Sequence, residues 1–259
     1  MRARRTVTSA PPPPESGPRA RTYRLLIDSA MRLMQRGGLV TVAEVAADAG
    51  VSRATAYRYF PSRSKLVTAV VDESLGPART FATQETDGRA RLTDLFVKTF
   101  PRLKEFEPQL RAALQLALEH WALERSGRLE EEPFRRGHRM QLLDRAARPL
   151  REQLGVARYN RLLHALSLVY GIEPYIVLKD MWAASDRDVE AVSRWVLDAL
   201  IAAALKEAAH DARNGGADGA RQHSRRAGKR SVVRAGATLG GRGAAGAERA
   251  VARRALPVR

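Results

Sequence analysis

The chain has 259 residues, with 45 Lys and Arg against 28 Asp and Glu, a formal net charge of +17 and no cysteine. A chain of this length can bury the core of one or two domains. The lack of cysteine excludes disulfides, a Cys-ligated metal site and a thiol nucleophile. No apolar run approaches the roughly 18 residues of a membrane-spanning helix, so we expect a soluble, cytoplasmic protein.

The excess positive charge lies mostly at the two ends of the chain. Residues 1–22 hold five Arg and one Glu, and residues 210–259 hold twelve Lys and Arg and three acids, a net charge of +9. The first end is Pro-rich and the second is rich in Gly, Ala and Arg, which is typical of disorder. We therefore expect a disordered basic arm at 1–20 and a disordered basic tail at 210–259. The tail would attract polyanions without reading sequence, and a merely solubilising role is an equally good interpretation.

The part between these ends is predicted to be helical throughout. It is rich in the strong helix formers Ala, Leu, Arg and Glu, and its apolar residues recur at three- and four-residue steps. The predicted helices are 21–35, 42–49, 53–60, 63–74, 89–105, 108–125, 134–154, 158–180 and 187–209. Gly76-Pro77 and the polar stretch that follows predict a boundary between a domain at 21–75 and a second domain at 76–209.

The second and third predicted helices carry the most informative pattern. Thr41 and Glu44 fit a capping box at the start of one short helix, Gly50 marks a turn, and Ser52 caps the next helix. Two short helices joined by such a turn predict a helix-turn-helix motif. Ala46, Val51 and Ala56 would pack the two helices together. The other face of the later helix then presents basic, hydroxyl and aromatic side chains that suit the DNA major groove.

The segment Thr41–Asp72 resembles the DNA-binding domain of the TetR family of bacterial transcriptional regulators. The resemblance rests on Val45-Ala46, on Ala49-Gly50-Val51-Ser52, on the run from Thr55 to Phe60 and on the run from Ser62 to Leu66. Ala56 replaces the usual Leu, and Arg63 stands where the family usually has Lys. The resemblance implies a core position for Phe60 and contacts to bases or phosphates from a larger set, which is Thr41, Ser52, Arg53, Thr55, Tyr57, Arg58, Tyr59 and Arg63.

The same resemblance implies an all-α fold class, with an N-terminal three-helix DNA-binding domain and a C-terminal helical bundle for ligand binding and dimerisation. Two apolar stripes are the expected dimer seam, unless they face the core of their own chain. They consist of Leu162, Leu163, Leu166, Val169 and Tyr170, and of Val189, Val192, Val196, Leu197, Leu200, Ile201 and Leu205. A two-fold dimer presents two recognition helices, so the operator should be near-palindromic.

A ligand pocket is also implied, and bulky apolar residues between bundle helices are its expected walls. The expected lining is Phe100, Leu103, Leu118, Trp121, Met140 and Tyr170, with Glu173 orienting the ligand. Phe106, Leu114, Leu143, Trp182 and His120 are further candidates, and ordinary core packing is the competing interpretation for every one of them. The identity of the ligand does not follow from these residues.

An enzyme is not expected, because the five His residues lack the spacing of a metal site and no nucleophile motif occurs. The G-x-G-x-x-G match at 241–246 follows no predicted strand, so no nucleotide cofactor is expected either. The predicted function is a sequence-specific transcriptional regulator, a ligand-responsive repressor. Its expected partners are a palindromic DNA operator, a second copy of the chain and a small-molecule effector, with no membrane. An architectural, nucleoid-type DNA-binding protein is the alternative.

Overall fold

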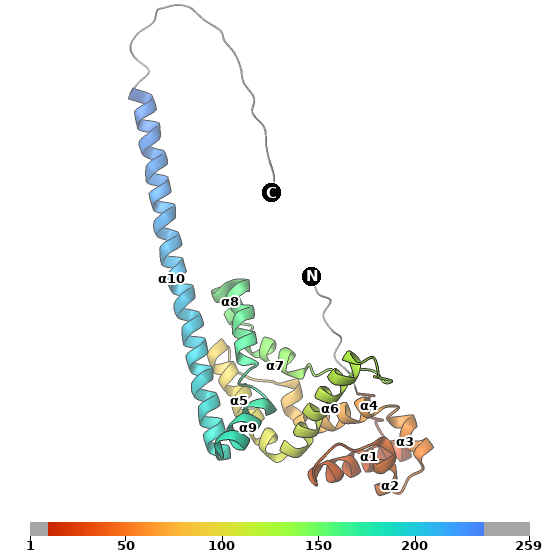
Figure 1. Cartoon of the computed structure of the whole chain (residues 1–259). Coiled ribbons are helices and arrows are strands. Elements are labelled where there is room, and N and C mark those ends of the chain that lie inside the picture. The colour runs from red at the N-terminus through yellow and green to blue at the C-terminus, as the bar shows by residue number, and fades with distance from the viewer. Residues whose placement is uncertain (1–9, 236–259) are drawn as a thin grey trace, which may run out of the picture. The chain divides into compact units, whose positions relative to one another are not determined.

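The computed structural model describes residues 10–235, with side chains described from residue 10 to residue 213 (Figure 1). Within that range all regular structure is helical, as the all-α fold class predicted. The chain divides into two units, residues 1–209 and residues 210–259. None of the described helices is both long and apolar enough to span a membrane.

The first four helices are α1 (Gly17–Gln35), α2 (Val42–Asp48), α3 (Arg53–Tyr59) and α4 (Arg63–Leu75). Side-chain caps set where three of them begin. Thr41 accepts from the Glu44 N–H at 3.1 Å, and its own N–H donates to the Glu44 carboxylate at 2.7 Å, which is the predicted capping box. Ser52 caps α3 and Ser62 caps α4 in the same way. Gly50, with φ of 67°, makes the turn between α2 and α3.

These helices surround an apolar core of their own. Ala46 and Ala56 are fully buried where α2 meets α3, because only small side chains allow the two short helices to approach so closely. Phe60 is fully buried against the ring of Tyr23, so its predicted core position is confirmed. Residues of α6 close this core from the other side, through Ala112, Ala113 and Leu116.

The remaining elements follow in the order η1 (Gly76–Thr80, a 3-10 turn), α5 (Gly88–Glu105), α6 (Glu107–Arg125), α7 (His138–Ala147), α8 (Leu150–Leu166), α9 (Ile172–Ile176), η2 (Val177–Met181, a π-helical turn) and α10 (Asp186–Ala235). A second core forms between α5, α7, α8 and the first turns of α10. Helix α6 packs on α1 and α4 of the first group as well as on α5, so it joins the two cores.

Two predicted helices differ from the structure. The expected helix at 134–154 is instead a loop up to Gly137, then α7, a break at Arg148-Pro149 and the start of α8. Gly155, with φ of 70°, interrupts α8 in the gap expected between the helices 134–154 and 158–180. The expected helix at 158–180 is broken between Ser167 and Gly171, whereas Pro174 lies within the first turn of α9, where proline is tolerated.

The ends of the helical part also differ from expectation. Helix α1 begins at Gly17 rather than Arg21, because Pro18 occupies the first turn, where its fixed φ suits a helix. The backbone of α10 stays helical to Ala235, although a disordered tail was expected from residue 210. Ala and Arg have high helix propensity, so a segment rich in them can form a helix although its composition is also typical of disorder. Of the expected disordered segments, residues 1–9 and 236–259 lie outside the described residues.

Most residues of the two apolar stripes expected at a dimer seam belong instead to one core within the chain. Leu162, Leu166 and Tyr170 of the first stripe share a core with Val189, Leu197 and Ile201 of the second. Leu163, Val169, Leu200 and Leu205 are partly buried against the same core. A stripe at three- and four-residue steps shows that a helix buries one face, but it does not show which chain covers that face.

Candidate functional site

Helix α3 has one buried side and one exposed side. The Ser52 hydroxyl accepts from the Thr55 N–H at 3.1 Å and so fixes where the helix starts. From there Ala56 points into the core, and Phe60 follows the last turn into the same core. The opposite side of α3 presents Arg53, Ala54, Tyr57 and Arg58 to solvent.

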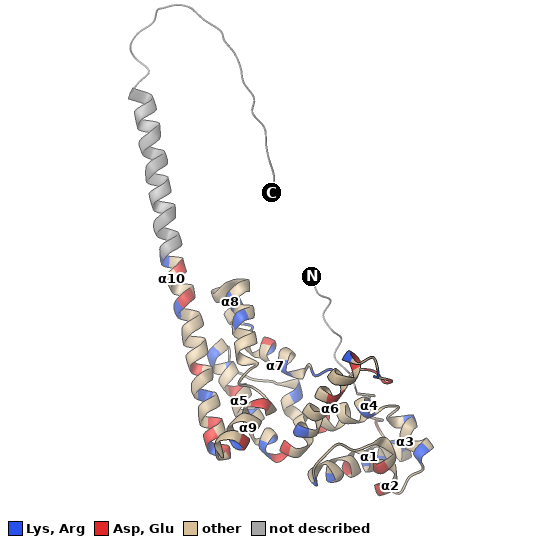
Figure 2. Ribbon diagram, viewed as in Figure 1, with Lys and Arg blue, Asp and Glu red and all other residues tan. Residues whose placement is uncertain are grey.

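Three of the expected DNA-binding residues dominate this exposed side. The Tyr57 side chain is 46% exposed, which is unusual for an aromatic residue in a domain with its own apolar core. Arg53 and Arg58 are exposed, and neither has a salt-bridge partner among residues 10–213. Figure 2 shows blue, the colour of Lys and Arg, on the ribbon near the α3 label. The arrangement combines two uncommitted guanidinium groups with a phenol, which together can contact phosphates and base edges.

Four other expected contacts are partly engaged within the chain. The Thr41 hydroxyl bonds to Glu44 at 2.8 Å, and the Ser52 hydroxyl bonds to that of Thr55 at 2.9 Å. Tyr59 is half-buried and its ring lies 6.4 Å from the ring of Tyr23 on α1. Thr41 and Ser52 therefore fix where α2 and α3 begin, and Tyr59 packs α3 against α1. The side chains of Thr41 and Ser52 remain exposed.

Arg63 does not share this exposed side. Its guanidinium donates to Glu119 of α6 at 2.5 Å and lies 4.0 Å from Glu131 in the loop before α7. The neighbouring Lys65 pairs with Glu132 at 2.9 Å. Carboxylates of α6 and of the loop before α7 thus neutralise the cation that was expected to bind a DNA phosphate. The sequence could not indicate this, since Glu119 and Glu131 lie more than fifty positions further along the chain.

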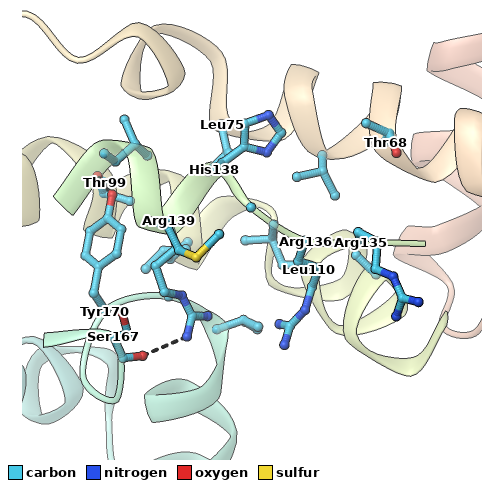
Figure 3. A pocket seen from close by; sticks show the side chains of 18 of the residues that line it. Thr68, Leu75, Thr99, Leu110, Arg135, Arg136, His138, Arg139, Ser167 and Tyr170 are labelled. Carbon is cyan, nitrogen blue, oxygen red and sulfur yellow. Dashed lines mark hydrogen bonds between the residues drawn. The ribbon is translucent and has the colours of Figure 1, made fainter. Parts of the chain in front are cut away.

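A cavity of about 320 Å³ lies between α4, α5, α6, α7 and the segment around Tyr170 (Figure 3). Apolar side chains make most of its wall, and a run of charged residues at the start of α7 makes the rest. The principal lining residues are Thr68, Val71, Leu75, Thr99, Leu103, Leu110, Phe134, Arg135, Arg136, His138, Arg139, Met140, Leu142, Ser167, Tyr170 and Ile172.

Of the seven residues expected in the pocket, Leu103, Met140 and Tyr170 line the cavity. Phe100 is buried in the neighbouring core, and Glu173 lies behind the wall, where it bonds to Arg136 and Arg139. Leu118 and Trp121 were wrongly placed, because they are 61% and 57% exposed on the outer side of α6.

Two further candidate residues, Trp182 and His120, do not line the cavity. Trp182 is 75% exposed, and His120 is buried outside the cavity, where its Nδ1 accepts from the Phe134 N–H at 3.0 Å. The contributions of α4 and of the run from Phe134 to Arg139 to the cavity were not predicted. The cluster Arg135-Arg136-Gly137-His138-Arg139 is the sequence signal for this part of the wall, although its position suited the helix expected at 134–154.

The hydroxyl groups of Thr99 and Tyr170 in the cavity wall are hydrogen-bonded to each other. Thr99 donates its hydroxyl hydrogen to the Leu95 carbonyl at 2.7 Å, so the Tyr170 hydroxyl, 2.9 Å away, donates to Thr99. Burial raises the pKa of Tyr170 to about 12. Burial also raises the pKa of Glu173, but the guanidinium groups of Arg139 and Arg136 outweigh it and hold that pKa below its usual value.

Known proteins resemble this chain most clearly at the helix-turn-helix. Residues 26–70 match the family model described as bacterial regulatory proteins, tetR family. These residues form a TetR-type DNA-binding domain. The repressor LfrR of Mycolicibacterium smegmatis, described as an HTH-type transcriptional repressor, is 41% identical to the chain over 56 residues. That match spans 22% of this chain and 30% of the repressor.

Two solved regulators also resemble the chain that contains this TetR-type domain. A TetR transcriptional regulator from Rhodococcus sp. RHA1 is 19% identical, and the match covers 70% of this chain and 97% of the regulator with a TM-score of 0.48. A tetR-family regulator from Streptomyces coelicolor is 22% identical, with 76% and 89% covered and a TM-score of 0.48.

Proposed function

We propose that this protein is a sequence-specific transcriptional repressor that binds a near-palindromic operator as a dimer and releases it when a small molecule binds. The observation that carries the DNA-binding part is the exposed side of α3, where Arg53, Tyr57 and Arg58 project from a TetR-type domain. An α-helix of this kind fits the major groove, where the pattern of donors and acceptors distinguishes all four base pairs.

The position of α4 supports control by a ligand. Its first turn follows directly on α3 and is capped by Ser62, and its later turns carry Thr68, Val71 and Leu75 into the cavity wall. A molecule that fills the cavity therefore contacts the helix next to the recognition helix. Ligand binding can shift DNA affinity only if the ligand contacts differ between the DNA-bound and released forms, and α4 is the element that connects the cavity wall to α3.

The dimer surface is assigned to the exposed side of α10. Val192, Trp195, Ala199 and Ala202 follow each other there at three- or four-residue steps, and all four are exposed. Trp195 is 71% exposed and Val192 is 41% exposed. The alanines beyond them allow another helix to approach closely. A second copy of the chain, packed there about a two-fold axis, would bury this stripe and place two α3 helices on one duplex.

The test of the DNA-binding function is a selection from random-sequence duplexes with the full-length protein. We expect one inverted-repeat sequence to be enriched. Operator affinity of wild type and of Tyr57→Phe is then measured by fluorescence anisotropy against a scrambled duplex. Tyr57→Phe keeps the ring and removes only the hydroxyl, so a loss of operator affinity with unchanged circular dichroism supports the proposal. Equal binding to every duplex would favour the architectural alternative.

A further inference from the structure

The cavity has walls that suit an apolar body. Its apolar lining comes from several helices and includes Val71, Leu75, Leu103, Leu110, Phe134, Leu142 and Ile172. The hydroxyl hydrogens of Thr68, Thr99 and Ser167 are each donated to the carbonyl four residues earlier, at 2.7, 2.7 and 2.8 Å. These hydroxyls therefore have no hydrogen left to donate to a ligand. Most polar groups of a ligand placed against this part of the wall would lack hydrogen-bond partners.

The charged groups of the wall gather in one run, residues 135–139. Arg136 donates to one oxygen of Glu173 at 2.8 Å, and Arg139 donates to the other oxygen. Figure 3 shows both arginine side chains extending in the same direction. Two guanidinium groups thus share one carboxylate. Elsewhere in the run, Arg135 pairs with Glu124 at 2.6 Å, and His138 lies 3.0 Å from Asp72, which also pairs with Arg79 at 2.8 Å.

This arrangement leaves about one unit of excess positive charge at Arg136 and Arg139. No negative group inside the cavity offsets it, because Tyr170 stays protonated near neutral pH and Glu173 is already shared. A bound cation would add to the excess charge, whereas a bound anion would cancel it. On the cavity side, the apolar walls screen this charge less than bulk water does.

The two arginines have different roles. Arg139 is 24% exposed and held at two points, by Glu173 and by the Ser167 carbonyl at 2.7 Å. Arg136 is 38% exposed, and its Nη1 nitrogen donates the hydrogen bond to Glu173. A guanidinium carries five N–H donors, so Arg136 can hold Glu173 and still donate to a ligand. Arg136 is then the ligand-binding residue and Arg139 the positioning residue.

We infer that the cavity binds an amphipathic organic anion, with its apolar body against the α4, α5 and α6 walls and a single carboxylate on Arg136. The inference rests on the proposed ligand-responsive function and names the chemical class of the effector. A carboxylate is the best match for a guanidinium, because two N–H donors can meet its two oxygens in parallel.

The experiment uses three probes with the same eight-carbon chain and different head groups: octanoate, 1-octanol and octyltrimethylammonium. Binding to the full-length protein is measured by isothermal titration calorimetry without DNA. We expect octanoate to bind most tightly and the cation most weakly. Arg136→Gln should weaken octanoate binding about tenfold, as expected for loss of a charged hydrogen bond, and should leave 1-octanol binding unchanged.

Matched variants separate the charge from the fold. Arg136→Lys keeps the positive charge and should keep the preference for octanoate, while Glu173→Gln removes the competing carboxylate and should strengthen octanoate binding. Arg125→Gln loses an arginine from the outer side of α6, where it stacks on Trp121, and should bind all three probes as the wild type does. Circular dichroism checks that each variant is folded.

Equal binding of octanoate and 1-octanol, or octanoate binding that ignores Arg136→Gln, would overturn the inference. Operator binding, measured separately without any probe, distinguishes this failure from failure of the proposed function. A protein that selects an operator but binds no octanoate disproves the ligand class alone. A protein that binds octanoate through Arg136 but selects no operator disproves the repressor and leaves the ligand class standing.

Discussion

Arg63, the first residue of α4, donates a hydrogen bond to Glu119 of α6 at 2.5 Å. The pair joins the DNA-binding domain to the helix that closes both cores. The Arg63 side chain is 22% exposed, and Glu131 adds a second carboxylate at 4.0 Å. A guanidinium held in this way stabilises the contact between the domains and has little freedom to reach a DNA phosphate. Arg53 and Arg58, ten and five positions earlier, are exposed on α3 and can reach DNA.

Arg53→Ala and Arg58→Ala should each weaken operator binding by about 1–3 kcal/mol, because each removes a base or phosphate contact. Neither should change the midpoint of thermal unfolding by much, since both side chains are exposed. The check is an anisotropy titration with operator and scrambled DNA. Full operator affinity in both variants would show that this side of α3 does not face DNA.

Arg63→Gln should reduce the stability of the protein more than it reduces operator binding. Loss of its carboxylate contacts should lower the free energy of unfolding by on the order of 1 kcal/mol. Operator affinity should fall less than in Arg53→Ala. Chemical denaturation gives the stability, and the same anisotropy assay gives the affinity. If the variant is as stable as the wild type but loses DNA binding, Arg63 acts as the phosphate contact first expected of it.

Trp195→Glu should convert the dimer to a monomer. The substitution places a charge where a second copy would exclude water, and burying an unpaired charge is costly. Sedimentation velocity gives the mass. Trp121→Glu is the matched control, since Trp121 is also an exposed tryptophan but lies on α6 away from the α10 stripe, and it should remain dimeric. A dimeric Trp195→Glu protein would place the interface elsewhere.

Deletion of residues 211–259 removes a net charge of +9. The truncated protein should bind all DNA more weakly, and its affinity should depend less steeply on salt, because fewer counterions are released on binding. Its preference for operator over scrambled DNA should persist, because the side chains of α3 make the contacts that distinguish base sequences. Titrations at several salt concentrations measure both quantities. A truncated protein with no operator preference would assign part of the specific recognition to the tail.

The ion pairs of Glu173 should make stability depend on acid pH. Because Arg139 and Arg136 lower its pKa in the folded protein below the usual 4.5, the ionised form is favoured by folding. That stability is complete above the unfolded-state pKa and is lost as the pH falls through the folded-state pKa. The melting temperature of wild type should therefore exceed that of Glu173→Gln at neutral pH, and the gap should close below about pH 4. Glu105→Gln removes a more exposed carboxylate, so its melting temperature should differ less from that of the wild type. If the difference between wild type and Glu173→Gln stays constant down to pH 3, the ion pairs of Glu173 do not cause it.

The local pattern of the sequence determined the helix-turn-helix. The capping box of Thr41, the turn at Gly50 and the small residues Ala46 and Ala56 act over a few positions, so their spacing alone predicted α2, α3 and the side of α3 that faces outward. The all-helical fold followed from composition and from the three- and four-residue repeat of apolar residues. Only the tertiary structure decided which surfaces meet. It paired Arg63 with Glu119, placed most of the two apolar stripes in one core of the same chain, and brought α4 together with Arg136 and Arg139 around the cavity. These contacts join residues far apart in the chain, and periodicity shows that a helix face is buried without showing what buries it.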